Sequence, residues 1–229
     1  MTDQPDKTDQ SQLSGRLWLA EALWKLGSIQ FGDFTLGRTV RNSPVYLNVK
    51  LLISRPSDLR RTARLIADEL RMGQTMRNRQ VEPFDAVAGV PIGGLHIATA
   101  LSLELDQPLL YVRPSRTGNV EHSSHIEGIY RPGQGTVIVD DLAAGGGSLV
   151  ETVERLRESG LRVHNAIVLI DREQGASGRL RMMGVRLHSI LTLDVVLEHL
   201  HSRGHVSNED FESSRRYFAR EGQPRSEYD

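Results

Sequence analysis

The sequence contains no cysteine, which excludes disulfide bonds, thiolate metal sites and cysteine nucleophiles. Charge of one sign is not in excess either, because 28 lysine and arginine residues balance 29 aspartate and glutamate residues to a formal net charge of −1. Proteins that bind nucleic-acid backbones usually carry a clear basic excess, so we expect no nucleic-acid partner. A reducing compartment such as the cytoplasm is compatible with the lack of cysteine.

Long hydrophobic runs that could span a membrane are lacking as well. The most apolar window, 87–105, is interrupted by a proline, three glycines, a histidine and a glutamate. We therefore expect a buried strand, a loop and a helix in this window, and no membrane partner. The polar N-terminus lacks the basic start and apolar stretch of a signal peptide, which favours a cytoplasmic protein.

The length of 229 residues favours one compact domain. Residues 1–14 are polar with almost no apolar side chain, and we expect a flexible tail there and a second one over 222–229. Between the tails, 15–221 are expected to form a single domain. In it, 15–56 make a small N-terminal segment and 57–221 carry the core and the closing helices.

Hydrophobic periodicity predicts the first elements. The segment 17–26 has apolar residues at helical spacing, which predicts an amphipathic helix with its two tryptophans in the core or at a dimer contact. The segment SPVYLNVKLLISRP (43–56) predicts a strand. The next segment, 57–71, predicts a helix with Ser57 as its N-cap.

Apolar strands then alternate with helices over most of the chain. Short unbroken apolar runs such as 137–139 and 166–170 are typical of strands buried on both faces of a parallel sheet. The expected fold class is therefore α/β, with a mostly parallel sheet flanked by helices. In such sheets the ligand lies beyond the carboxyl ends of the strands. The loops that this rule selects follow Val90, Val112, Asp141 and Asp171.

The clearest chemical signal is GTVIVDDLAAGGGSLVETVERLRESG (135–160), in which an apolar strand ends in two acids and a glycine-rich loop opens a helix. Consecutive glycines let the backbone aim several N–H groups at one point, and Ser148 adds a hydroxyl, so the loop suits a phosphate. The carboxylates of Asp140 and Asp141 suit a ribose diol or Mg²⁺. The alternative is that the acids only cap a turn and the glycines only shorten a connection.

The segment VIVDDLAAGGGS (137–148) resembles the signature for 5-phosphoribosyl 1-pyrophosphate (PRPP) of type I phosphoribosyltransferases, and the chain from about Leu17 to Arg220 is similar to the orotate phosphoribosyltransferase family. The resemblance implies the type I phosphoribosyltransferase fold, with 15–56 as a hood segment. It implies transfer of the phosphoribosyl group of PRPP to orotate, giving orotidine 5′-phosphate and pyrophosphate in pyrimidine (UMP) biosynthesis. It also implies Mg²⁺ as cofactor and a homodimer.

The same resemblance assigns roles around PRPP. Asp140 and Asp141 would hold the ribose hydroxyls, and Mg²⁺ would be held through PRPP, with Asp141 as a candidate protein ligand. Gly93 and Gly94 lie in the loop that would approach the pyrophosphate. The residues that would wrap the 5′-phosphate are Ala144, Gly145, Gly146, Gly147 and Ser148.

Three residues are implied on the orotate side. Arg172 would hold the orotate carboxylate, a role that suits a planar bidentate donor, although it could instead only pair with a neighbouring acid. Arg38, rather than Arg41, would supply a cation from the hood segment. Ala144 would lie near the base. Because Ala144 and Gly145 stand where the family usually has threonines, two side-chain hydroxyls are missing.

The loop that would close over the pyrophosphate departs further from the family. Catalytic cations are expected there from Arg113 and Arg116, but Pro114 stands where the family has a lysine, and no lysine occurs between Arg113 and Gly135. An arginine replaces the charge of a lysine but not its geometry. The two histidines at 122 and 125 are expected to be loop residues, since no third metal ligand is in view.

These departures leave two alternatives to an active orotate phosphoribosyltransferase. One is a regulatory protein of the same fold that binds PRPP or a nucleotide with little turnover, because the missing lysines act chiefly in the transition state. The other is a phosphoribosyltransferase for a different base, which Ala144 would permit.

Overall fold

The structure is a computed structural model that describes residues 7–36, 40–114 and 126–221. The chain divides into two compact units. Unit 1 combines residues 1–54 with 191–229, and unit 2 comprises residues 55–190. By these contacts the closing helices group with the N-terminal segment, whereas the single domain 15–221 stays a prediction.

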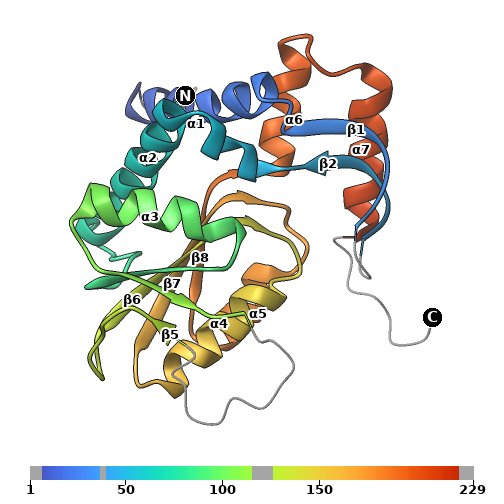
Figure 1. The fold of residues 1–229 in the computed structure, drawn as a ribbon. Helices are drawn as coiled ribbons and strands as arrows, with labels where there is room; N and C mark the ends of the chain where they lie inside the picture. Colours follow the sequence, from blue (N-terminus) through green and yellow to red (C-terminus); the bar gives the residue numbers. More distant parts are fainter. Residues whose placement is uncertain (1–6, 37–39, 115–125, 222–229) are drawn as a thin grey trace. The chain divides into compact units, whose positions relative to one another are not determined.

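Unit 2 is built on a six-stranded sheet with the order β5-β4-β3-β6-β7-β8 (Figure 1). The strands β3, β4, β6 and β7 are parallel to their neighbours among these four, whereas β5 pairs antiparallel with β4. The mostly parallel α/β fold class is thereby confirmed. The strands are β3 (Ala86–Gly89), β4 (Leu109–Val112), β5 (Ile126–Glu127), β6 (Gly135–Ala143), β7 (Arg162–Asp171) and β8 (Arg186–Thr192).

Helices cover both faces of this sheet, which explains why its central strands are apolar without alternation. Ile138 belongs to a buried cluster with Leu149 and Val153 on one face. The neighbouring residues of β6, Val137 and Val139, are also fully buried, and they point to the other face, where α3 packs on β3 and β6. The helices of unit 2 are α2 (Pro56–Thr75), α3 (Gly93–Leu105), α4 (Gly147–Glu158) and α5 (Ala176–Met182).

Unit 1 joins both ends of the described chain. It contains an antiparallel hairpin in which Ile29 is paired with Leu47, and it packs α1 against α6 and α7 against β2 (Figure 1). Its elements are α1 (Lys7–Lys25), β1 (Ile29–Leu36), β2 (Val40–Leu47), η1 (Val49–Ser54), α6 (Leu193–Ser202) and α7 (Asn208–Glu221).

The segment 43–56, predicted as one strand, changes structure after Leu47. It continues as the 3₁₀-helix η1, whose buried residues are Val49 and Leu52. A spacing of three matches the three residues per turn of a 3₁₀-helix, so both side chains reach the same side. The apolar sequence alone did not indicate this three-residue spacing.

Two helix starts also differ from the prediction. Helix α1 begins at Lys7, so part of the predicted 1–14 tail is helical. Helix α2 begins at Pro56 with Arg55 as its N-cap, in place of Ser57. Proline fits the first helical position, and it holds the preceding residue extended, as the φ of −129° at Arg55 shows.

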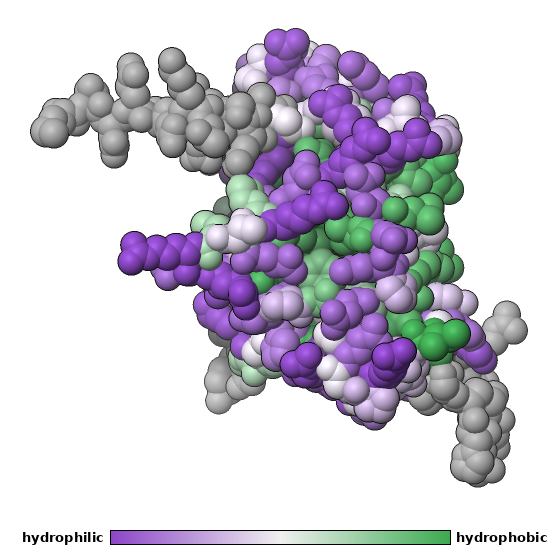
Figure 2. Space-filling view, turned by 90° about the vertical axis from the view of Figure 1, so that its left-hand side faces the viewer, coloured by the Kyte–Doolittle hydropathy of each residue, from purple (hydrophilic) through white to green (hydrophobic). Residues whose placement is uncertain are grey.

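None of the helices in the described ranges is long and apolar enough to cross a membrane. The face drawn in Figure 2 is largely hydrophilic, with hydrophobic residues gathered in patches toward its right-hand side.

Candidate functional site

The loops that follow β3, β6 and β7 lie side by side at the carboxyl ends of these strands. The sheet pairing runs up to Gly89 with Val139 and to Ala143 with Asp171. It continues beyond the strands, because the Val90 N–H donates to the Val139 carbonyl at 2.9 Å, and the Arg172 N–H donates to the Ala143 carbonyl at 2.8 Å. Three of the loops selected from the sequence therefore meet at one edge of the sheet.

The two acids, Asp140 and Asp141, lie within β6, which continues to Ala143 instead of ending at the acids. Both are buried, with exposed fractions of 5% and 7%. The Asp141 N–H donates to Asp140 Oδ1 at 2.8 Å, which fixes the first carboxylate against the backbone. Successive residues of a strand point to opposite faces, so the two carboxylates lie on opposite faces of the sheet.

The start of α3 is pressed against this acid pair. A Cβ on Gly93 would overlap the Asp141 carboxyl group, and a Cβ on Gly94 would lie 2.7 Å from the Asp140 Cα and closer still to the Val139 carbonyl oxygen. Only glycine permits this approach without a shift of the backbone or of the carboxylate. The predicted pyrophosphate loop and the predicted ribose-binding acids are thus neighbours.

The glycine-rich loop after β6 contains three glycines in two different situations. Gly146 is the N-cap of α4 with a φ of 77°, and a Cβ there would lie 2.9 Å from the Ala176 Cα. Among the described residues, nothing lies within 4 Å of a Cβ on Gly145 or Gly147. The fold thus requires glycine at Gly146, while the open space at the other two fits a ligand against the first N–H groups of α4.

A cavity of about 240 Å³ adjoins this loop and brings Ser148 together with Arg113. Its lining comes from the ends of β3 and β4 and from the first turns of α4. Glu151 and Thr152, which the sequence reading did not select, also line it; they follow Ser148 at i+3 and i+4, the helical spacing that shares a face.

Arg113 is about half exposed, and its guanidinium forms an ion pair with Glu127. It stands at the end of the described segment 40–114, so the predicted catalytic residue Arg116 and the histidines at 122 and 125 lie outside the described residues. The same holds for Arg38 in the hood segment. Arg41 lies in β2 of unit 1.

Arg172 and Asp171 follow each other at the carboxyl end of β7, and both are buried. Burial raises the pKa of Asp171, and the hydrogen bond that its Oδ1 accepts from the Glu173 N–H at 2.8 Å opposes this only in part. The Ala176 N–H donates to the Ala144 carbonyl at 3.0 Å, which ties the loop after β7 to the glycine-rich loop. Arg172 is thereby held next to the predicted phosphate loop.

The carboxylates of the site fit a Mg²⁺ ion that binds together with a phosphate ligand. In the described part of the chain, no three His, Cys, Asp or Glu side chains gather as a metal-binding group. Mg²⁺ commonly binds through one or two carboxylates together with the phosphate oxygens of a ligand. Asp140 and Asp141 offer such carboxylates beside the phosphate loop, so the residues present fit an ion that arrives with its ligand.

Comparison with known proteins agrees with this geometry. The family model for the phosphoribosyl transferase domain matches residues 62–181, which include both acids and the glycine-rich loop. Fold and site together therefore define a phosphoribosyltransferase domain.

Individual relatives narrow the family further. The orotate phosphoribosyltransferase of Aeropyrum pernix is 40% identical over 182 residues, which are 80% of this chain and 92% of that protein. The uridine 5′-monophosphate synthase of Bos taurus is 35% identical over 199 residues, which are 87% of this chain but 40% of that protein. The chain belongs to the orotate phosphoribosyltransferase family.

A solved structure supports the same assignment. The UMP synthase of Leishmania donovani has a TM-score of 0.78 and 32% identity, and the match covers 89% of this chain and 42% of that one. The type I phosphoribosyltransferase fold predicted from the signature is thereby confirmed, as is the family.

Proposed function

We propose that the protein is an orotate phosphoribosyltransferase, which transfers the phosphoribosyl group of PRPP to orotate and releases pyrophosphate. The observation that carries this proposal is the meeting of Asp140, Asp141 and Gly93 beside an open glycine-rich loop. The arrangement offers a carboxylate pair for a ribose diol and N–H donors for a phosphate at adjacent positions.

PRPP would be anchored at its non-reacting end first. The 5′-phosphate lies in the loop 144–148, where the open space over Gly145 and Gly147 leaves room for it. The carboxylates of Asp140 and Asp141 accept hydrogen bonds from the ribose hydroxyls. Anchoring the ring in this way orients its anomeric carbon toward the base, and such positioning lowers the barrier of a substitution.

The chemical step forms a bond between an orotate ring nitrogen and the anomeric carbon, while the bond from that carbon to pyrophosphate breaks and the proton of that nitrogen is released. Positive charge grows on the ribose and negative charge on the departing pyrophosphate, so cations near the leaving group matter most. Arg113 is our candidate for such a cation, and its position in the lining of the cavity beside Ser148 supports this role. Mg²⁺, when bound with PRPP, would neutralise part of the pyrophosphate charge.

Orotate would be held by Arg172. Its position next to the phosphate loop and its planar guanidinium suit a bidentate bond to a carboxylate. Ala144 would lie near the base without the hydroxyl that the family usually has there, so this contact rests on Arg172 and on backbone groups.

A regulatory protein that binds PRPP with little turnover is the second candidate. The ion pair of Arg113 with Glu127 favours it, because this cation already has an anionic partner in the structure. A phosphoribosyltransferase for another base is the third, favoured by the missing hydroxyl at Ala144. Homodimer formation and a cytoplasmic location stay predictions from the sequence.

The decisive experiment follows the orotate absorbance band in a mixture of protein, Mg²⁺, PRPP and orotate, with detection of released pyrophosphate. Loss of orotate with matching pyrophosphate supports the proposal. No turnover with intact PRPP binding by calorimetry supports the regulatory protein, and turnover of another base alone supports the third candidate. Light scattering during gel filtration tests the homodimer.

A further inference from the structure

A second cavity lies in unit 2 at the other end of the sheet, where β7 and β8 begin. Its volume is about 380 Å³, within the range of small-molecule pockets. The lining combines the segment before β3, the first residues of β7 and β8, both ends of α5 and the turn that follows α5. It shares no lining residue with the cavity at Ser148 and Arg113.

Positive charge dominates this lining. The lining contains the three arginines Arg79, Arg181 and Arg186 but one carboxylate, that of Glu82, and His164 adds an exposed imidazole. Within the described residues, no ion pair engages Arg79 or Arg181. The chain as a whole carries a net charge of −1, so three arginines around one hollow are a local feature and not a general one.

The third arginine, Arg186, donates its hydrogen bonds to uncharged groups. Its Nη1 donates to the Gln80 backbone carbonyl at 3.0 Å and also to the Gln80 side-chain oxygen. These bonds fix the guanidinium beside the segment before β3 but do not neutralise its charge. The positive charge therefore remains available to an anion.

The walls of the cavity are held in place from behind. Arg157 of α4 donates to the Met183 carbonyl at 2.8 Å and to the Val163 carbonyl at 2.6 Å, which ties the turn after α5 to β7. The buried Asn165 donates to the Glu82 carbonyl at 3.4 Å. These bonds fix the backbone segments that carry the lining residues, so the segments need not rearrange when a ligand binds.

We propose that this cavity binds a small anion that carries several phosphate groups, at a site separate from the one beside Asp140 and Asp141. Guanidinium groups bind phosphate oxygens in pairs of hydrogen bonds, and three of them around one hollow suit a chain of phosphates better than a single carboxylate. The proposal holds whether or not the protein turns over orotate, because it uses none of the residues assigned to that reaction.

The test titrates tripolyphosphate into the protein by isothermal calorimetry. We compare the wild type with the double variant Arg79→Ala/Arg181→Ala, and with a matched double variant, Arg77→Ala/Arg179→Ala. The matched pair removes the same charge from the same two segments, but neither residue lines the cavity. All four arginines are exposed, so the fold should tolerate both doubles, which circular dichroism checks.

The proposal expects a binding event, distinct from any binding at the glycine-rich loop, that weakens at least about tenfold in the cavity double variant and stays within about twofold in the matched one. Equal binding by the wild type and the cavity double variant overturns it, since the phosphate then binds elsewhere. Equal weakening in both doubles also overturns it, since only the overall charge then matters.

A variant that should strengthen binding gives a second test of the proposal. Glu82→Gln removes the carboxylate from the lining, and tripolyphosphate should then bind a few times more tightly. Unchanged affinity contradicts the proposed position of the anion. A parallel titration with adenosine 5′-triphosphate distinguishes the source of the phosphates: tighter binding than tripolyphosphate points to a nucleotide, and equal binding to recognition of the phosphate chain alone.

Discussion

The Asp141 carboxyl group fills the space in which a side chain on Gly93 would lie. The two residues are far apart in the sequence and come from the start of α3 and the end of β6. Their contact couples the loop expected to approach the pyrophosphate to the carboxylate expected to hold the ribose. Any side chain at the glycine must therefore displace the acid.

Gly93→Ala tests this coupling. The added methyl group should push the Asp141 carboxylate out of place, at a stability cost of about 1–3 kcal/mol for overpacking. PRPP binding should weaken at least about tenfold, as measured by calorimetry with Mg²⁺ present. Gly178→Ala is the matched control, because its Cβ meets nothing within 4 Å among the described residues. Unaltered PRPP affinity in Gly93→Ala would contradict the assigned role of this contact.

Arg172→Ala tests the orotate contact. Loss of a charged hydrogen-bonding pair is worth about 1.5–3 kcal/mol, so the KM for orotate should rise roughly ten- to a hundredfold while PRPP binding stays nearly intact. Asp141→Asn should show the reverse pattern, with weaker binding of PRPP and Mg²⁺. Steady-state kinetics with each substrate varied in turn separates the two effects. Equal loss of both substrates in Arg172→Ala would exclude the assignment.

The sheet and its site-forming loops followed from the sequence because their signals are local. An unbroken apolar run such as 137–139 is typical of a strand covered on both faces, and the acids and glycines that follow it are adjacent in the chain. The approach of Gly93 to Asp141 is not local. No pattern in either segment reports on the other, so only the folded chain shows the contact.

Other features were missed for different physical reasons. The run 49–54 is apolar enough for a strand, but its buried residues recur every third position. Residues 7–14 carry no apolar stripe, yet they extend α1. The grouping of α6 and α7 with the N-terminal segment depends on packing between distant parts of the chain. Glu151 and Thr152 could have been predicted as cavity residues, because they follow Ser148 at i+3 and i+4 of a predicted helix and so share its face.

His188 makes the stability of unit 2 depend on pH. Burial, with a smaller contribution from the charge of Arg186, lowers its pKa from 6.5 to about 4, and its Nε2 lies 3.2 Å from Asn165 Oδ1. Between these two pH values the unfolded chain binds a proton that the folded chain does not. The contribution of His188 to stability therefore rises with pH across this window, by at most about 1.4 kcal/mol per pH unit.

The measurement is hydrogen exchange of peptides from β7 and β8 at several pH values between 4 and 6.5. Protection should fall as the pH is lowered, and His188→Gln should reduce that slope. His164→Gln is the matched control, since this neighbouring histidine is exposed and should leave the slope unchanged. A slope that persists in His188→Gln would show that another group titrates.

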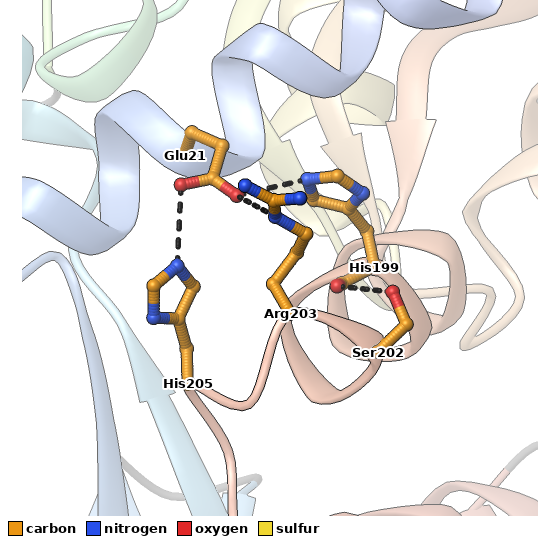
Figure 3. A network of polar contacts seen from close by, with 5 residues as sticks. All are labelled: Glu21, His199, Ser202, Arg203 and His205. Atoms are coloured by element: carbon orange, nitrogen blue, oxygen red, sulfur yellow. Dashed lines mark hydrogen bonds and ion pairs between the residues drawn. The ribbon is translucent and has the colours of Figure 1, made fainter.

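Glu21 of α1 is the centre of a polar network in unit 1 (Figure 3). Its Oε1 lies 3.0 Å from His199 Nε2 and 3.8 Å from Arg203 Nε, and its Oε2 lies 3.3 Å from His205 Nε2. Burial by itself would raise the pKa of Glu21, but the hydrogen bonds and charges of His199 and His205 together outweigh burial and lower it. The ionised carboxylate thus links the first helix to the segment around the end of α6.

A lowered carboxylate pKa stabilises the folded state above the ordinary pKa of the group, and this stability is lost as the pH falls through the lower folded value. Unit 1 should therefore lose stability when the pH drops below about 4.5. Glu21→Gln should remove this loss of stability and cost about 1 kcal/mol at neutral pH.

Both tryptophans of the chain lie in α1, and Trp24 stacks on His205 with ring centroids 5.5 Å apart, so tryptophan fluorescence during urea unfolding reports on this unit. Glu198→Gln, at an exposed position of α6, is the control that should behave as the wild type. If Glu21→Gln still loses stability below pH 4.5, the network does not hold the helices together.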